Sequence, residues 1–109
     1  MAAEKLYNVR IYETDPALRK EFLVAFKKFQ AGIPGRGFKQ MDVLTEERED
    51  GSLRLVAIIP VTSREQVRTA LNEPWMPDLA PFVTLMQSLV MQLDLELGLS
   101  PALLGTIAK

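Results

Sequence analysis

The chain has 109 residues, of which 48% are hydrophobic and 25% charged, and its formal net charge is −1. These values are typical of one globular domain, predicted over residues 1–109 with a core at 5–97 and a C-terminal tail at 98–109. The sequence contains no cysteine and no histidine, which excludes disulfides, thiolate nucleophiles and histidine general bases. No basic excess is present, so we expect no nucleic-acid partner and no attraction to anionic membranes.

Nothing in the sequence indicates targeting or membrane insertion. The first residues, Met1 to Lys5, do not resemble a leader, because no apolar stretch follows a basic one. The longest apolar run, Leu55 to Val61, is far shorter than the ~18 residues that cross a bilayer. We therefore expect a cytoplasmic protein without membrane contacts.

Residues 6–12 predict a first strand, because apolar and polar side chains alternate there. One face holds Tyr7, Val9 and Ile11, and the other holds Asn8, Arg10 and Tyr12. We expect the first of these faces to pack against the helices. A helix is predicted next, capped by Asp15 with Pro16 at its first position, and it closes at Gly32 before Pro34.

Residues 38–48 and 53–60 predict two strands that form a hairpin. A three-residue loop with Gly51 in the left-handed region fits the side chains best, because it pairs Glu46 with Arg54. The same register gathers one apolar face, made of Met41, Val43, Thr45, Leu53, Leu55, Ala57 and Ile59. A two-residue loop would instead put acidic side chains on that face.

A second helix is predicted from Ser63, which with Gln66 has the spacing of a capping box. Residues 75–87 contain two prolines but keep apolar side chains at helical spacing, so we predict a broken helix there. Residues 90–97 predict a fourth strand, in which Met91 and three later leucines share an apolar face.

The predicted order is therefore strand, helix, strand, strand, helix, strand. This order indicates a ferredoxin-like α+β domain, with a four-stranded antiparallel sheet and two helices on one face. The uncovered sheet face is too apolar for solvent, so we expect a homodimer that packs through it. The residues predicted at that interface are Asn8, Arg10, Tyr12, Asp42, Leu44, Arg54, Val56, Gln92 and Asp94.

Four segments, in their order and spacing, resemble the dimeric α+β barrel superfamily over residues 5–97. They are the helix at 22–30 running into Ile33-Pro34-Gly35, the strand at 38–46, the helix start at 63–65 and Asn72-Glu73-Pro74-Trp75. This superfamily includes antibiotic-biosynthesis monooxygenases, small polyketide cyclases, muconolactone-type isomerases and stress-response proteins. The resemblance implies that two sheets pack together in a dimer, and that each subunit holds a small-molecule pocket between its sheet and its helices.

The chain departs from the catalytic members of this superfamily at two places. Monooxygenase-like members often carry a tryptophan where this chain has Ile58-Ile59-Pro60, and many members carry a histidine where it has Trp75. Haem-degrading relatives bind iron through a histidine, so we do not expect this chain to degrade haem. Asn8 resembles their pocket asparagine but falls on the predicted dimer face.

The resemblance implies two alternative functions, and the sequence leaves both open. One is cofactor-independent oxygenation, cyclisation or isomerisation of an apolar aromatic or polyketide-like compound. The other is a non-catalytic dimer that binds a ligand or a protein partner. We expect no cofactor and no metal, since the acidic residues at 46–50 suit a solvated hairpin tip.

Two sets of site residues follow from the predicted faces. The predicted pocket is lined by Tyr7, Phe26, Met41, Trp75, Phe82, Met86 and Met91. The catalytic candidates are Tyr7 and Arg36, because a phenol or a guanidinium can stabilise negative charge on a substrate.

Overall fold

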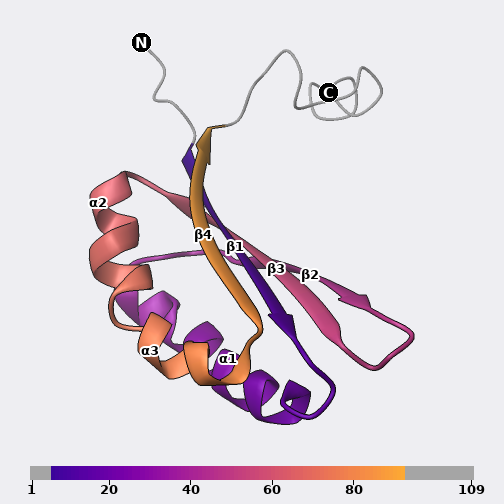
Figure 1. Ribbon diagram of the computed structural model, residues 1–109. Coiled ribbons are helices and arrows are strands. Elements are labelled where there is room, and N and C mark those ends of the chain that lie inside the picture. The colour runs from indigo at the N-terminus through magenta and orange to yellow at the C-terminus, as the bar shows by residue number, and fades with distance from the viewer. Residues whose placement is uncertain (1–5, 93–109) are drawn as a thin grey trace, which may run out of the picture.

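One antiparallel sheet contains four strands, β1 (Leu6–Thr14), β2 (Asp42–Glu47), β3 (Leu53–Val61) and β4 (Leu85–Gln92). Their order across the sheet is β2–β3–β1–β4 (Figure 1). The structure is a computed structural model that describes residues 6–92. The predicted ferredoxin-like α+β topology is confirmed.

The helices gather on one side of this sheet (Figure 1). They are α1 (Arg19–Gly32), the 3-10 turn η1 (Pro34–Arg36), α2 (Arg64–Gln66), the π-helix η2 (Val67–Asn72), α3 (Met76–Leu79) and the 3-10 turn η3 (Ala80–Phe82). Three phenylalanines of α1, Phe22, Phe26 and Phe29, are buried against the sheet. No helix within residues 6–92 is long and apolar enough to cross a membrane.

Two helix starts follow the predicted signals, one of them with an offset. The Ser63 hydroxyl accepts a hydrogen bond from the Gln66 backbone N–H at 3.1 Å, which confirms the predicted cap. The Asp15 side chain also accepts from a backbone N–H, that of Leu18, at 3.0 Å. This contact closes a separate turn, so α1 begins at Arg19, after the predicted start.

The fourth strand begins earlier than the sequence predicts. Residues 85–87 belong to β4, where we expected a broken helix. Pro81 lies in the last helical turn, and Val83 leaves it in an extended conformation. The Thr84 N–H then donates to the Glu13 carbonyl at 2.7 Å, and pairing of Glu13 with Leu85 starts the ladder. Residues 93–97 of the predicted strand lie outside the described residues.

The hairpin between β2 and β3 has the predicted register. Glu46 pairs with Arg54, and the Arg48 N–H donates to the Ser52 carbonyl at 3.0 Å, which leaves a three-residue loop. Gly51 has φ of 88°, in the left-handed region. A side chain there is strained, because a Cβ atom approaches the following carbonyl oxygen.

We expect Gly51→Ala to lower the free energy of unfolding by about 1 kcal/mol. Its added Cβ would also lie 3.4 Å from the Pro16 Cβ. Gly35→Ala is the matched control, since a Cβ there meets nothing within 4 Å and needs no positive φ. Urea denaturation of both variants checks the difference. Equal stability of the two variants would contradict the strained turn.

The predicted faces of β1 are wrong. Asn8, Arg10 and Tyr12 face the helices and are fully buried, whereas we expected them at a dimer interface. The cause is the pairing with β3, which places Arg10 opposite Ala57 and Tyr12 opposite Leu55. Opposite residues share a face, and the leucine-rich face of β3 packs on the helices.

The faces of β4 are exchanged in the same way. Val90 pairs with Asn8 and Gln92 pairs with Leu6, so both lie on the side of the helices. Met91 pairs with Tyr7 on the open face, where it is 51% exposed. Gln92 is therefore not an open-face residue, and Asp94 lies outside the described residues.

The open face of the sheet is nonetheless strongly apolar. Leu44 and Leu89 are 62% and 43% exposed on it. Its apolar members, from four strands, are Tyr7, Val9, Ile11, Leu44, Val56, Ile58, Leu85, Leu89 and Met91. Asp42 and Arg54 share this face, so four of the predicted interface residues lie where the sequence placed them.

Candidate functional site

A group of polar side chains lies between the sheet and the helices, where three of them are fully buried and two are half-buried. We call it the polar cluster, and its members are Asn8, Arg10 and Tyr12 of β1, Asn72 of η2 and Ser88 of β4. Alternate residues of a strand share a face, and Ser88 pairs with Arg10 across the sheet. Asn72 reaches them from the helix layer.

The members of the polar cluster are joined by a directed chain of hydrogen bonds. Asn8 Nδ2 donates to Ser88 Oγ at 2.8 Å, and Ser88 Oγ donates to Asn72 Oδ1 at 2.7 Å. Arg10 Nη1 donates to the same Asn72 oxygen at 2.6 Å. Asn72 therefore accepts from both strands and fixes Arg10 against the helix layer.

Arg10 is the most unusual member of the polar cluster. Its side chain is fully buried, and no residue between 6 and 92 forms an ion pair with it. It lies 4.9 Å from the ring centroid of Phe29, a cation–π contact that offsets only part of the desolvation cost. A buried cation without an anion attracts negative charge strongly in this setting of low polarity.

Two atoms of the polar cluster are buried without a hydrogen-bond partner among the described residues. They are Arg10 Nη2, a donor, and Asn8 Oδ1, an acceptor. Buried polar atoms normally find partners, so unpartnered ones call for an explanation. Since Asn8 and Arg10 are two residues apart on one strand, the unpartnered acceptor and the unpartnered donor lie on the same face of the sheet.

Tyr12 completes the site as a neutral phenol. Burial raises the pKa of Tyr12, and the nearby Arg10 charge opposes this shift only in part. The phenol oxygen accepts from Arg10 Nε at 2.5 Å, so its own proton is not used by that contact. Tyr12 can therefore donate a hydrogen bond but does not act as a base near neutral pH.

The π-helix η2 determines where Asn72 lies. The Glu73 N–H donates to the Arg68 carbonyl, five residues earlier, at 3.0 Å. Such widened turns are rare and occur often at functional sites, because they rotate one side chain out of the regular helical pattern. Here the last π-helical residue is Asn72, which the turn directs toward Arg10.

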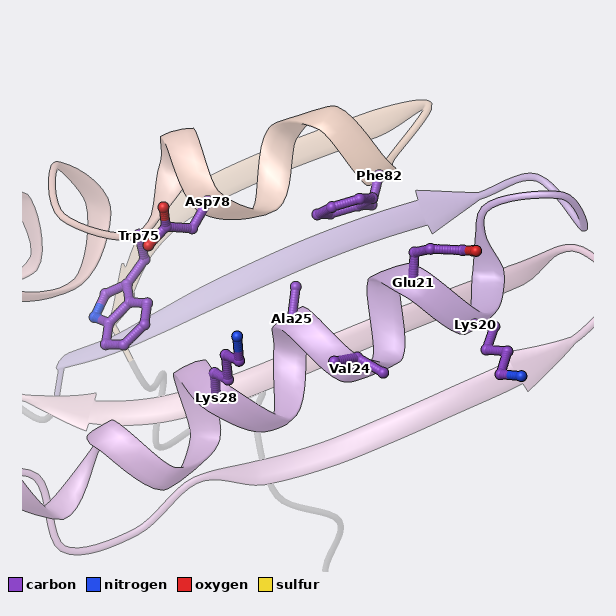
Figure 2. Close-up of a pocket in the computed structure, with 8 residues that line it drawn as sticks. All are labelled: Lys20, Glu21, Val24, Ala25, Lys28, Trp75, Asp78 and Phe82. Atoms are coloured by element: carbon purple, nitrogen blue, oxygen red, sulfur yellow. The ribbon is translucent and has the colours of Figure 1, made fainter.

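A groove lies on the outer surface of the helix layer, between α1 and the α3–η3 segment (Figure 2). Its volume is about 590 Å³, and its lining residues are Lys20, Glu21, Val24, Ala25, Lys28, Trp75, Asp78 and Phe82. The Trp75 ring meets Phe29 edge to face at 5.2 Å, and Phe29 in turn contacts Arg10. Phe29 therefore separates this outer groove from the polar cluster.

The structure distributes the predicted pocket residues over three places. Tyr7 and Met91 lie on the open sheet face, away from the polar cluster. Phe26 is in the core, with Met41 and Met86 packed against it. Only Trp75 and Phe82 line a groove, and it is the outer one.

The predicted catalytic residues do not come together. Tyr7 faces away from the helices, and the Arg36 guanidinium lies 4.9 Å from the centroid of the Trp75 ring. Sequence reasoning placed Arg10 and Tyr12 at the dimer interface instead of beside the helices, and it gave no role to Ser88. The available signal was an arginine in the middle of an apolar strand, which is rare unless the charge has a purpose.

The chain matches no protein-family model and no curated protein sequence. Several solved structures share its fold at low sequence identity. One is a candidate antibiotic biosynthesis monooxygenase from Nitrosomonas europaea, with 13% identity, a TM-score of 0.61, and coverage of 84% of this chain and 92% of that one. Another is a mutant of SnoaB, a cofactor-independent oxygenase from Streptomyces nogalater, with 22% identity, a TM-score of 0.58, and coverage of 82% and 92%.

A third similar structure is a dimeric ferredoxin-like protein from an uncultured marine organism. It has 12% identity and a TM-score of 0.57, and the alignment covers 86% of this chain and 99% of that one. At these identities the comparisons establish the fold. The chain therefore has the ferredoxin-like α+β fold of antibiotic-biosynthesis-monooxygenase-like and dimeric ferredoxin-like proteins.

Proposed function

We propose that this chain binds an apolar aromatic or polyketide-like compound at the polar cluster and oxygenates it without a cofactor. The observation that carries the proposal is Arg10, a fully buried cation without a carboxylate partner in residues 6–92. Such an arrangement is costly for the protein alone, and it is repaid when a substrate brings negative charge. The similarity to a cofactor-independent oxygenase supports the reaction class.

The chemistry needs a substrate whose C–H group is acidic, such as the methylene of an aromatic ketone. Loss of that proton to solvent leaves an enolate, and its oxygen accepts from Arg10 Nη2 while the guanidinium charge stabilises it. The enolate carbon adds dioxygen to give a peroxide anion, which takes up a proton. Loss of water from the hydroperoxide leaves a new carbonyl, so one methylene and one dioxygen give one carbonyl and one water.

The other members of the polar cluster orient the substrate. Asn8 Oδ1 accepts from a substrate hydroxyl, and Tyr12 donates its free proton to a second oxygen. Asn72 and Ser88 hold Arg10 and Asn8 in place through the hydrogen-bond chain. Fixing a reactive substrate in one orientation is itself a large part of catalysis.

One observation favours binding without catalysis as a second candidate. None of the five members of the polar cluster accepts a proton near neutral pH, since asparagine, serine, arginine and a neutral phenol all lack that ability. A substrate whose C–H group has a pKa well above neutral pH would therefore be bound but not deprotonated. In that case the protein is a ligand carrier or sensor.

We also propose that two copies pack through the open sheet face. The exposed side chains of Leu44, Leu89 and Met91 support this arrangement, because a contiguous apolar surface of this kind usually marks an interface. Similar structures described as dimeric ferredoxin-like proteins support it as well. The homodimer would cover that face and leave the polar cluster inside each subunit.

Incubation with dithranol, a hydroxylated three-ring aromatic ketone, under isotope-labelled dioxygen separates the two candidates. For an oxygenase we expect the label in a new carbonyl of the product, formed faster than in buffer alone, as measured by mass spectrometry. Bound, unchanged dithranol in native mass spectra would favour the carrier. Neither binding nor turnover, across a panel of related hydroxylated aromatic ketones, would contradict both.

A further inference from the structure

The outer groove between α1 and α3–η3 has the properties of a second ligand site. Its volume of about 590 Å³ lies in the range of pockets for small molecules. It opens at the protein surface, whereas the polar cluster is buried on the other side of Phe29. A ligand in this groove would therefore be different from the substrate proposed above.

The indole of Trp75 at one end of the groove is rigidly held. Phe29 contacts it at 5.2 Å, and Arg36 lies over the ring at 4.9 Å. On a third side the indole packs so closely on Gly32 that a Cβ atom there would lie 2.9 Å from the ring. The end of the groove that Trp75 forms is therefore preorganised before a ligand binds, which lowers the entropic cost of binding.

The rest of the groove combines an apolar surface with separated charges. Ala25 forms the floor between Trp75 at one end and Phe82 at the other (Figure 2). Lys28 of α1 extends toward the wall that carries Trp75 and Asp78, whereas Lys20 extends away from that wall (Figure 2). No ion pair within residues 6–92 engages Lys28 or Asp78, although they carry opposite charges on facing walls.

We propose that this groove binds a free aromatic amino acid or a closely similar aromatic zwitterion. The ligand carboxylate pairs with Lys28, and its ammonium group lies beside Asp78 and the Trp75 ring. The aromatic side chain covers Ala25 and packs on Phe82. Two opposite charges next to an apolar floor match a zwitterion better than they match a simple acid or a simple amine.

Trp75 provides a direct measurement, because it is the single tryptophan of the chain. Titration with L-phenylalanine, which does not fluoresce at tryptophan wavelengths, should change the Trp75 emission until saturation. Isothermal titration calorimetry on the same samples gives the dissociation constant independently. We expect hydrocinnamate, which lacks the ammonium group, and phenethylamine, which lacks the carboxylate, each to bind about fivefold more weakly.

Three variants test whether Lys28 and Asp78 contact the charged groups of the ligand. Lys28→Gln and Asp78→Asn should each raise the dissociation constant for L-phenylalanine about fivefold, because each removes one ion pair at an exposed site. Lys27→Gln is the matched control, since it removes the same charge from the same helix, does not line the groove and should leave the constant unchanged. All three side chains are on the surface, so the variants should fold normally.

Several results would overturn the proposal. One is the absence of heat and of a fluorescence change with L-phenylalanine at millimolar concentration. Another is equal binding of the three ligands, which would indicate a plain apolar site. A third is an equal effect of Lys27→Gln and Lys28→Gln, which would indicate a general charge effect. None of these results depends on the polar cluster, so they leave the proposed oxygenation untouched.

Discussion

Arg10→Met is expected to reduce turnover or ligand binding strongly while the fold persists. We expect turnover of dithranol, or its affinity if it is only bound, to fall about 100-fold, the typical effect of removing one preorganised donor to an oxyanion. The free energy of unfolding should not decrease. Methionine has a similar length and no desolvation cost, and replacing buried charge with apolar side chains is often neutral or stabilising.

The two readouts separate a functional role from a structural one. If Arg10 served mainly to hold the fold together, its loss would lower stability, since Asn72 and Tyr12 each lose a hydrogen-bond donor. Asn72 keeps its hydrogen bond from Ser88, which limits that loss. A stable but inactive variant would therefore assign Arg10 to the ligand.

Tyr12→Phe is the matched control for this experiment. It removes the acceptor of Arg10 Nε and leaves a buried guanidinium with two unpartnered nitrogens, so it should destabilise the protein by roughly 1–3 kcal/mol. Adding Tyr12→Phe to Arg10→Met should cost much less, because the charge is then gone. Marked destabilisation by Arg10→Met in urea titrations, with activity retained, would contradict the proposed site.

The topology could be predicted because its signals are local. Gly51 and the alternation around it determine the hairpin loop, and the Ser63 cap marks a helix start. The element order then restricts the fold to a few arrangements. Each of these signals involves residues that are close together in the sequence.

The faces of β1 could not be predicted from alternation alone. Alternation shows that Val9 and Arg10 point in opposite directions. It does not show which of them faces the helices, because the residues that pair with β1 are largely apolar on both faces of the sheet. The pairing of Arg10 with Ala57 decides which face meets the helices, and this contact spans much of the chain. Polar residues are tolerated inside because they bond one another.

The polar cluster lacked a sequence signal for the same reason. Arg10 and Asn72 are 62 residues apart, and Asn8 and Ser88 are 80 apart. Asn72 also depends on the widened turn of η2, which no residue pattern indicates. What the sequence did contain was part of the exposed apolar surface on the other side of the sheet, at Leu44 and Val56.

Leu89→Lys is expected to dissociate the proposed homodimer. Leu89 lies on the open face in the edge strand β4, opposite Val9, and is 43% exposed in the single chain. A lysine there would place a charge without a partner within the proposed apolar interface. In a twofold dimer the change occurs twice, so we expect the dissociation constant to rise at least 100-fold.

Val24→Lys provides a matched control on the opposite side of the molecule. Val24 is 56% exposed on α1, more than Leu89, so the same substitution there tests exposure alone. Sedimentation equilibrium should show a dimer for Val24→Lys and for the parent protein, but a monomer for Leu89→Lys. A monomeric parent, or a dimer that survives Leu89→Lys, would remove the open face as the interface.

The dimer also predicts how stability depends on concentration. A partner that binds only the folded chain stabilises it by mass action, so the melting temperature of the parent should rise with protein concentration. For Leu89→Lys it should stay constant. Because β1 carries Val9 on the open face and Arg10 toward the helices, the proposed dimer would brace the same strand that holds the polar cluster. Dissociation should therefore weaken ligand binding as well, although Leu89 itself is not part of the polar cluster.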